Sequence, residues 1–240
     1  MTDLNGKRIL LTGGTSGIGR ATLTALAAAG ARVLTCGRHQ ASLEEAMTAT
    51  PGDVSVVAAD LAGEKGVDTV FAAVDDTLGG VDMLVACAAL GADPIVDMDD
   101  TNWRYVLDTN LAAYLGCAKH AIERMEAAGG GHLLFVGSIS TEIKAVGESV
   151  YAATKAGVQA FAETLRKEVA GRNIKVSVIQ PGSVDTAMQQ CSTEEKRAAV
   201  AAGEMLDPAE IAEAILFVLT RSAACDIVNL RIEPLLQKTA

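Results

Sequence analysis

A tyrosine and a lysine four residues apart form the most chemically suggestive pair in the sequence. Tyr151 and Lys155 fall in a stretch with helical periodicity, so we expect them on one face of a helix. A phenol has a pKa of about 10 and is a poor acid or base at neutral pH. A neighbouring ammonium group stabilises the phenolate and lowers that pKa toward the working range. The spacing therefore predicts that Tyr151 transfers a proton and that Lys155 lowers its pKa.

Two further polar residues are candidates for the same site. Ser138 directly follows an apolar run, at the carboxyl end of an expected strand, where open α/β sheets bind their ligands. Its hydroxyl could hydrogen-bond the same substrate oxygen as Tyr151. Asn110, in the long helix that precedes this strand, could hold a water molecule beside Lys155. Taken singly, the serine could be a cap and the asparagine a buried hydrogen-bonding group, but the ordered set favours catalysis.

A glycine-rich segment, TGGTSGIG at positions 12–19, follows the first expected strand. Gly13 permits a tight turn, Gly17 lets the backbone approach a pyrophosphate, and Gly19 allows close packing of helix on sheet. The helix that follows offers free N–H groups and the positive end of its dipole to phosphates. No P-loop lysine is present, which disfavours ATP or GTP. The segment predicts a dinucleotide site that includes Gly13, Thr15, Ser16, Gly17, Ile18 and Gly19.

Two charged residues are expected near the adenosine half of the dinucleotide, and one of them bears on the choice between NAD and NADP. At the end of the second strand of such a unit, an acidic residue grips the ribose diol of NAD, and a basic one accommodates the 2′-phosphate of NADP. Arg38 takes this place, which predicts NADP(H) and leaves NAD possible; a solvated surface arginine is the alternative. Asp60, followed by Leu61 after the third strand, is placed to reach the adenine, or else to cap the next turn.

The elements that must position these residues alternate regularly along the chain. Short apolar runs separated by amphipathic stretches predict βαβ units and a parallel sheet. Residues 183–207 show no clear period and are expected to form a mobile loop. The expected strands are 7–12, 32–36, 53–59, 81–88, 132–137, 174–179 and 227–232. The expected helices are 16–29, 42–48, one ending at 78, 101–126 (capped by Asp99 or Asp100), 150–170 and 208–219.

Composition narrows the class of protein. A length of 240 residues fits one domain, residues 1–240, and half of the residues are hydrophobic. A net charge of -10 disfavours binding to nucleic acid or to anionic membranes. Five scattered cysteines and three histidines argue against a disulfide framework and a metal centre. A polar N-terminus and no apolar stretch of spanning length lead us to expect a cytoplasmic protein without membrane contact.

Over nearly its whole length the sequence resembles the short-chain dehydrogenase/reductase family. The resemblance rests on the following residues: the segment 12–19, Asp60, Asn110, Ser138, the YxxxK of Tyr151 and Lys155, and Pro181-Gly182. It implies a Rossmann fold with a single seven-stranded parallel sheet and helices on both faces. It further implies a tetrad of Asn110, Ser138, Tyr151 and Lys155 in the roles given above. The nicotinamide side would be lined by Pro181, Gly182, Val184 and Thr186, together with Tyr151 and Lys155.

The activity implied is hydride transfer between NADP(H) and a small ketone or aldehyde and its alcohol. The resemblance also implies a homodimer or homotetramer formed by pairing the long helices 101–126 and 150–170. Two alternatives remain: a dinucleotide-binding regulator that is catalytically silent, and an epimerase or dehydratase relative. An intact tetrad argues against the first, and the short chain argues against the second.

The sequence departs from the family after the fourth strand. Where the family usually carries Asn-Asn-Ala-Gly, this chain has Ala86-Cys87-Ala88-Ala89. Ala86 and Ala88 are still expected to line the cofactor site. The missing amides would normally tie this strand end to its neighbours, so we expect weaker cofactor binding and lower local stability here. Cys87 is expected to be a packed small apolar residue rather than a reactive thiol.

Overall fold

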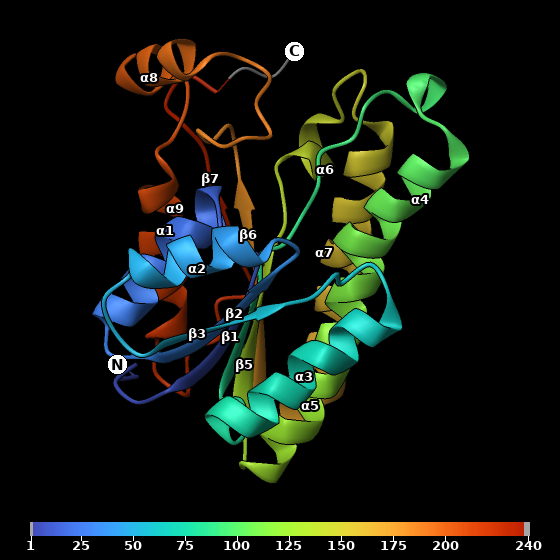
Figure 1. The fold of residues 1–240 in the computed structure, drawn as a ribbon. Helices are drawn as coiled ribbons and strands as arrows, with labels where there is room; N and C mark the ends of the chain where they lie inside the picture. Colours follow the sequence, from blue (N-terminus) through green and yellow to red (C-terminus); the bar gives the residue numbers. More distant parts are fainter. Residues whose placement is uncertain (1, 238–240) are drawn as a thin grey trace.

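The computed structural model describes residues 2–237 and contains one parallel sheet (Figure 1). Its seven strands lie in the order β3-β2-β1-β4-β5-β6-β7, and every neighbouring pair is parallel. The expected seven-stranded parallel sheet is therefore confirmed. The strands are β1 (Arg8–Thr12), β2 (Arg32–Gly37), β3 (Val54–Ala58), β4 (Met83–Ala86), β5 (Gly131–Val136), β6 (Ile174–Pro181) and β7 (Asn229–Ile232).

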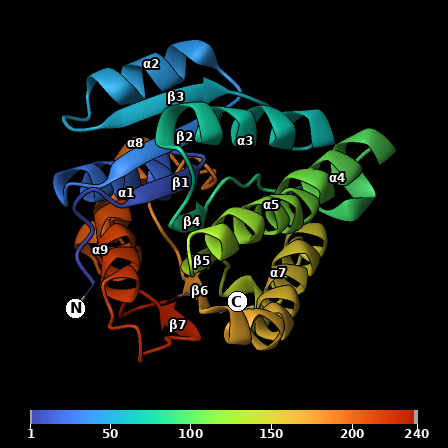
Figure 2. The ribbon, with the colours of Figure 1, turned by 90° about the horizontal axis from the view of Figure 1, so that it is seen from below.

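Helices cover both faces of the sheet, as Figure 2 shows in the view along it. One apolar cluster joins the sheet to α1, α2 and α9, and a second joins it to α3, α5 and α7. The central strands β1, β4, β5 and β6 read as nearly continuous apolar runs because both of their faces are buried. The helices are α1 (Gly17–Ala28), α2 (Gln40–Thr48), α3 (Glu64–Leu78), α4 (Asp100–Leu107), α5 (Ala113–Ala127), α6 (Ser140–Ile143), α7 (Ser149–Val169), α8 (Thr193–Ala201) and α9 (Pro208–Leu219).

The long helix expected over residues 101–126 is interrupted. A π turn, Asp108–Ala112, separates α4 from α5, and this turn contains Asn110. Asp99 caps α4 by accepting a hydrogen bond from the Asn102 N–H at 2.7 Å, as expected. The prediction of a single continuous helix was wrong. The apolar periodicity of the sequence continues through the π turn and so does not reveal it. π turns of this kind are frequent at functional sites.

The segment 183–207, expected to be a loop, contains the helix α8. A capping box starts this helix: Ser192 Oγ accepts from the Glu195 N–H, and the Glu195 carboxylate accepts from the Ser192 N–H. Each of its nine residues keeps part of its surface exposed, so the helix shows no apolar stripe. Among the described residues, no helix is long and apolar enough to span a membrane.

The strand order brings the expected site residues to one edge of the sheet. β1 lies between β2 and β4, so the chain reverses its direction of travel across the sheet at β1. In open α/β sheets, ligands bind in the crevice at the carboxyl ends of strands where this reversal occurs. Thr12 at the end of β1 is level with Cys36 on β2 and with Ala86 on β4. The glycine segment after β1 therefore opens onto that crevice.

Candidate active site

The glycine segment after β1 is shaped by close backbone contacts. Gly13 and Gly17 have φ angles of 77° and 49°, a region that favours glycine. A Cβ atom on Gly13 would lie 2.7 Å from Ala88 Cα, and one on Gly19 would lie 2.1 Å from the Gly13 carbonyl oxygen. In the described part of the chain, the Ser16 side chain makes no capping hydrogen bond to α1. A dinucleotide pyrophosphate fits this cradle, because the N–H groups at the start of α1 are left to bind an anion.

The strand end that departs from the family is held by a threonine. Thr12 is almost fully buried, and its Oγ1 accepts hydrogen bonds from the N–H groups of Cys87 at 3.0 Å and Ala88 at 3.1 Å. Two residues further on, Leu90 donates its N–H to Asn110 Oδ1, and its carbonyl accepts from Asn110 Nδ2, both at 2.8 Å. Backbone groups of the segment after β4 are thus fixed by side chains from β1 and from the π turn.

Tyr151 and Lys155 lie on α7 as expected, one turn apart and both on the inner side of the helix. Lys155 Nζ is 5.8 Å from the centroid of the Tyr151 ring. The same ammonium group donates to the Val136 carbonyl at 2.8 Å and to the Tyr114 hydroxyl at 3.4 Å. Tyr114, on α5, was not predicted, because a buried aromatic at helical spacing looks like ordinary core.

Burial dominates the electrostatics of this pair. It raises the pKa of Tyr151 to about 12, although a hydrogen bond with Ser138 acts in the opposite direction. Burial also lowers the pKa of Lys155 to about 8. We expected Lys155 to bring the tyrosine pKa down; in this structure the pKa is instead raised, because desolvation of the buried phenol is the largest influence on it. At neutral pH the Tyr151 phenol therefore holds its proton, and the raised pKa makes it a weaker acid than a free tyrosine.

Ser138 stands at the carboxyl end of β5, only 7% exposed, next to the start of α6. Its Oγ donates to Ser140 Oγ at 3.1 Å and accepts from the Ser140 N–H at 3.1 Å. These bonds fix the side chain, which acts to lower the pKa of Tyr151. The structure thus brings Ser138, Tyr151 and Lys155 together.

Asn110 lies deeper than the other three members of the expected tetrad. It is fully buried, and its carboxamide is engaged by the Leu90 backbone and, at 3.4 Å, by Thr154 Oγ1. The Asn110 side chain therefore holds the backbone at Leu90, in the segment after β4, and links that segment to α7 through Thr154. A water molecule held beside Lys155 stays a prediction.

Arg38 and Asp60 are joined by a residue that the sequence did not single out. Arg38 Nη1 donates to the Tyr105 hydroxyl at 3.0 Å, and this hydroxyl donates to Asp60 Oδ2 at 2.7 Å. Asp60 Oδ1 accepts from the Ala62 N–H at 3.1 Å, which is the turn-capping role considered above. Tyr105 belongs to α4, and no sequence motif marks its position.

The segment after β6 packs over the glycine turn. A Cβ on Gly17 would come within 2.9 Å of the Thr186 methyl group. Lys196 on α8 donates to the Thr186 carbonyl at 2.7 Å, and Gln237 Oε1 accepts from the Ser183 N–H at 2.8 Å. Other expected cofactor residues follow strand ends: Thr15 and Ile18 after β1, Leu61 after β3, Ala86 and Ala88 at β4, and Pro181, Gly182 and Val184 at β6.

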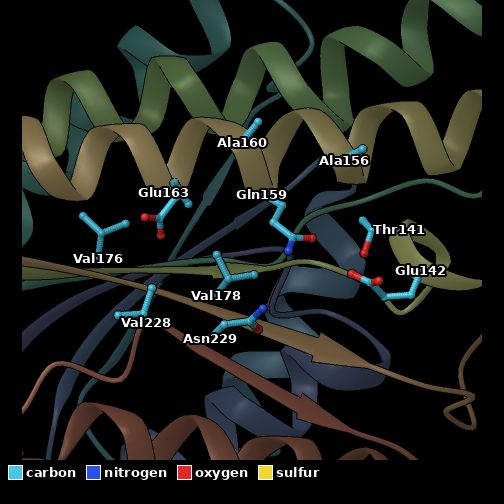
Figure 3. Close-up of a pocket in the computed structure, with 11 residues that line it drawn as sticks. Thr141, Glu142, Ala156, Gln159, Ala160, Glu163, Val176, Val178, Val228 and Asn229 are labelled. Atoms are coloured by element: carbon cyan, nitrogen blue, oxygen red, sulfur yellow. The ribbon is translucent and has the colours of Figure 1, made fainter.

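A cavity of about 390 Å³ lies on another side of α7 (Figure 3). Ala156, Gln159 and Ala160 of α7 face Val178 of β6 and Asn229 of β7 across it. Gln159 follows Lys155 by one turn of α7, whereas Ala156 and Ala160 lie further round the helix. Ser138, Tyr151 and Lys155 are not among the residues that line this cavity. Within residues 2–237, no group of three His, Cys, Asp or Glu side chains could hold a metal ion.

Fold and site together define a class, the NAD(P)-dependent oxidoreductases built on a Rossmann sheet. The family model described as short chain dehydrogenase matches residues 7–197. An uncharacterised oxidoreductase of Staphylococcus haemolyticus is 34% identical over 98% of this chain and 100% of its own. One of Staphylococcus aureus strain N315 is 33% identical over the same shares. The chain belongs to the short-chain dehydrogenase/reductase family.

Solved structures agree with this assignment. L-sorbose reductase from Gluconobacter frateurii, complexed with NADPH and L-sorbose, has a TM-score of 0.87 and 27% identity, covering 97% of each chain. A variant of actinorhodin polyketide ketoreductase with NADPH has a TM-score of 0.87 and 27% identity, covering 98% of this chain and 99% of that one. The protein is an oxidoreductase that acts on CH–OH groups with NAD(P) as acceptor.

Proposed function

We propose that this protein uses NADP(H) to interconvert a small ketone or aldehyde and its alcohol, with Tyr151 as the acid and base. The observation that carries the proposal is the cluster of Tyr151, Ser138 and Lys155 at the carboxyl end of β5, beside the segment that follows β4. Two NADPH-bound reductases of the same fold support the choice of cofactor.

In the proposed mechanism the three side chains act on one substrate oxygen. When substrate binds, Ser138 turns its hydroxyl proton from Ser140 Oγ to this oxygen, and Tyr151, protonated at neutral pH, donates its proton to the alkoxide that forms during reduction. The positive charge of Lys155 then stabilises the phenolate that Tyr151 becomes. When bound, the nicotinamide supplies the hydride in reduction and accepts it in oxidation. Asn110 positions the backbone around these groups.

Cofactor choice rests on Arg38. The guanidinium lies after β2, beside the place where a Rossmann unit holds the adenosine ribose, and is exposed to a ligand. A guanidinium pairs with a phosphate through two parallel hydrogen bonds. We therefore propose that Arg38 binds the 2′-phosphate of NADP(H). Gly13, Gly17 and Gly19 would hold the pyrophosphate.

Fluorescence titration with NADPH and, separately, with NADH tests the cofactor proposal. We expect a lower Kd for NADPH, and we expect Arg38→Asp to reverse the order. A wild-type preference for NADH would leave the oxidoreductase in place and overturn the role of Arg38.

Turnover of a carbonyl panel with the preferred cofactor tests the role of Tyr151. Tyr151→Phe keeps the ring and removes the transferable proton, so we expect kcat to fall by roughly 10²–10⁴-fold. The Kd for the cofactor should stay close to that of the wild type. Retained turnover in this variant would refute the acid–base role.

We also propose that two or four copies associate. The pairing surface would be formed by α7 and by α4 and α5, which continue each other through the π turn; α4 and the π turn pack beside α7 (Figure 2). Light scattering of the purified protein should give two or four times the chain mass of 24.7 kDa. A monomer mass would contradict the proposal.

A further inference from the structure

Three separate elements meet at the Tyr105 hydroxyl. Arg38 comes from the end of β2, Asp60 from the end of β3, and Tyr105 from α4. The hydroxyl oxygen is 3.0 Å from Arg38 Nη1 and 2.7 Å from Asp60 Oδ2. The guanidinium carbon also lies 5.8 Å from the centroid of the Tyr105 ring.

Chemistry fixes the direction of both hydrogen bonds. A guanidinium has only donors, and an ionised carboxylate has only acceptors. The phenol must therefore donate its proton to Asp60 and accept from Arg38. Asp60 in turn is held by the Ala62 N–H on its other oxygen. The Asp60 carboxylate thus sets the orientation of the Tyr105 hydroxyl group. A lone pair of the hydroxyl oxygen then points toward Arg38.

This arrangement bears on how Arg38 meets an anion. Arg38 is exposed, and ordering an unrestrained arginine side chain removes much of its rotamer freedom. A hydrogen bond that holds the guanidinium before ligand binding removes part of that cost. The hydroxyl also stands between the guanidinium and the Asp60 carboxylate. Without it, Arg38 would be free to pair directly with Asp60, which would neutralise the charge that a phosphate needs.

We propose that Tyr105 is a positioning residue that sets the preference for NADP(H) over NAD(H) by holding Arg38 ready for the 2′-phosphate. The proposal rests on the proposed function, in which Arg38 binds that phosphate. Tyr105 acts through Arg38, so its effect belongs to the cofactor with the phosphate. A tyrosine that only stabilised the fold would affect both cofactors alike.

The first experiment compares Tyr105→Phe with wild type by titration with NADPH and with NADH. We expect the Kd for NADPH to rise about threefold to tenfold, in line with the ordering of one arginine side chain. The Kd for NADH should stay within about twofold, and the melting temperature should be unchanged, since Tyr105 is half-exposed. Trp103→Phe is the matched control: it removes the indole hydrogen bond to Asp100 on the same helix. It should leave both Kd values unchanged.

A double-mutant cycle with Arg38→Ala then shows whether Tyr105 acts through Arg38. In the Arg38→Ala background, we expect Tyr105→Phe to have no further effect on the Kd for NADPH. A wild type that prefers NADH would overturn the proposed role of Arg38 and this inference together. A wild type that prefers NADPH, with an unchanged preference in Tyr105→Phe or an equal loss for both cofactors, would overturn the inference alone.

Discussion

Cys87 lies in the segment after β4, beside the candidate active site. Its thiol and the Lys155 ammonium are close enough to influence each other electrostatically. Burial raises the pKa of the Cys87 thiol to about 11, although the positive charge of Lys155 acts to lower it. The thiol is therefore neutral at physiological pH. A neutral thiol is a weak nucleophile, because the thiolate is the reactive form.

Alkylation with iodoacetamide at pH 8 should therefore discriminate among the cysteines. We expect exposed Cys225 to be modified well before Cys87, since Cys87 is partly buried and its pKa is raised. Buried Cys36 and Cys117 serve as internal standards for slow reaction. Peptide mass spectrometry against time gives each rate. Modification of Cys87 as fast as that of Cys225 would show that Lys155 activates the thiol.

Individual site residues differ in how far the sequence could reveal them. Tyr151, Lys155 and Ser138 stand in recognisable spacings, so they could be predicted together. The raised pKa of Tyr151 could not, because burial depends on every element packed around α7. Tyr105 meets Arg38 and Asp60 only after the ends of β2 and β3 and α4 come together. No local pattern encodes such a meeting.

At the scale of elements, the end of β1 and the segment after β4 form one joint. Thr12 Oγ1 accepts from two successive N–H groups, those of Cys87 and Ala88, and Gly13 leaves no room for a side chain beside Ala88. The missing family amides had led us to expect a loose strand end. The joint is instead held by Thr12 and by Asn110, at two separate points.

Thr12→Val tests this joint, because valine keeps the shape and removes the acceptor. Two backbone N–H groups would lose their partner, at a cost of about 1–3 kcal/mol for each group that stays buried. We expect the free energy of unfolding in urea to fall by about 2 kcal/mol. Thr24→Val, which removes an exposed hydroxyl that donates to the Arg20 carbonyl within α1, should change it by less than about 0.5 kcal/mol. Equal effects of the two variants would show that Thr12 does not hold the joint.

Elements with an apolar stripe could be predicted, and those without one could not. The strands and the helices α1, α3, α7 and α9 match the expected ranges to within a few residues. Helix α8 was missed because its residues pack too loosely to produce a pattern. Its capping box, Ser192 with Glu195, was nevertheless readable in the sequence. The π turn at Asn110 adds one wide turn to a continuous helical pattern, which periodicity cannot resolve.

At the scale of the whole molecule, a histidine buried within the sheet makes the free energy of unfolding depend on pH. His132 on β5 is 3% exposed and lies 2.8 Å from Ser177 Oγ on β6. Burial, with a smaller contribution from Lys175, lowers the pKa of His132 to about 3 from its ordinary value of 6.5. Between these values the unfolded chain binds a proton that the folded chain does not. The contribution of His132 to stability is thus complete above pH 6.5 and is lost as the pH falls toward 3.

His132→Asn should flatten the acid side of the stability curve. Between pH 4 and pH 6 we expect the slope of unfolding free energy against pH to fall by about 1.4 kcal/mol per pH unit. Urea denaturation at several pH values measures this slope, whatever the stability of the variant at pH 7. His39→Asn, which changes an exposed histidine, should keep the wild-type slope. An unchanged slope in His132→Asn would show that other groups cause the acid sensitivity.

Helix α8 can change its sequence over generations at little cost to folding. All of its residues are at least partly exposed, and, apart from Glu195 in the capping box and Lys196, substitutions at such surface positions usually shift stability by less than about 0.5 kcal/mol. Lys196 nevertheless ties the helix to the Thr186 carbonyl, beside the glycine turn. Mutation can therefore alter the surroundings of the crevice while the sheet and the reacting groups stay as they are. This separation gives a lineage a route to new specificities that does not pass through unstable intermediates.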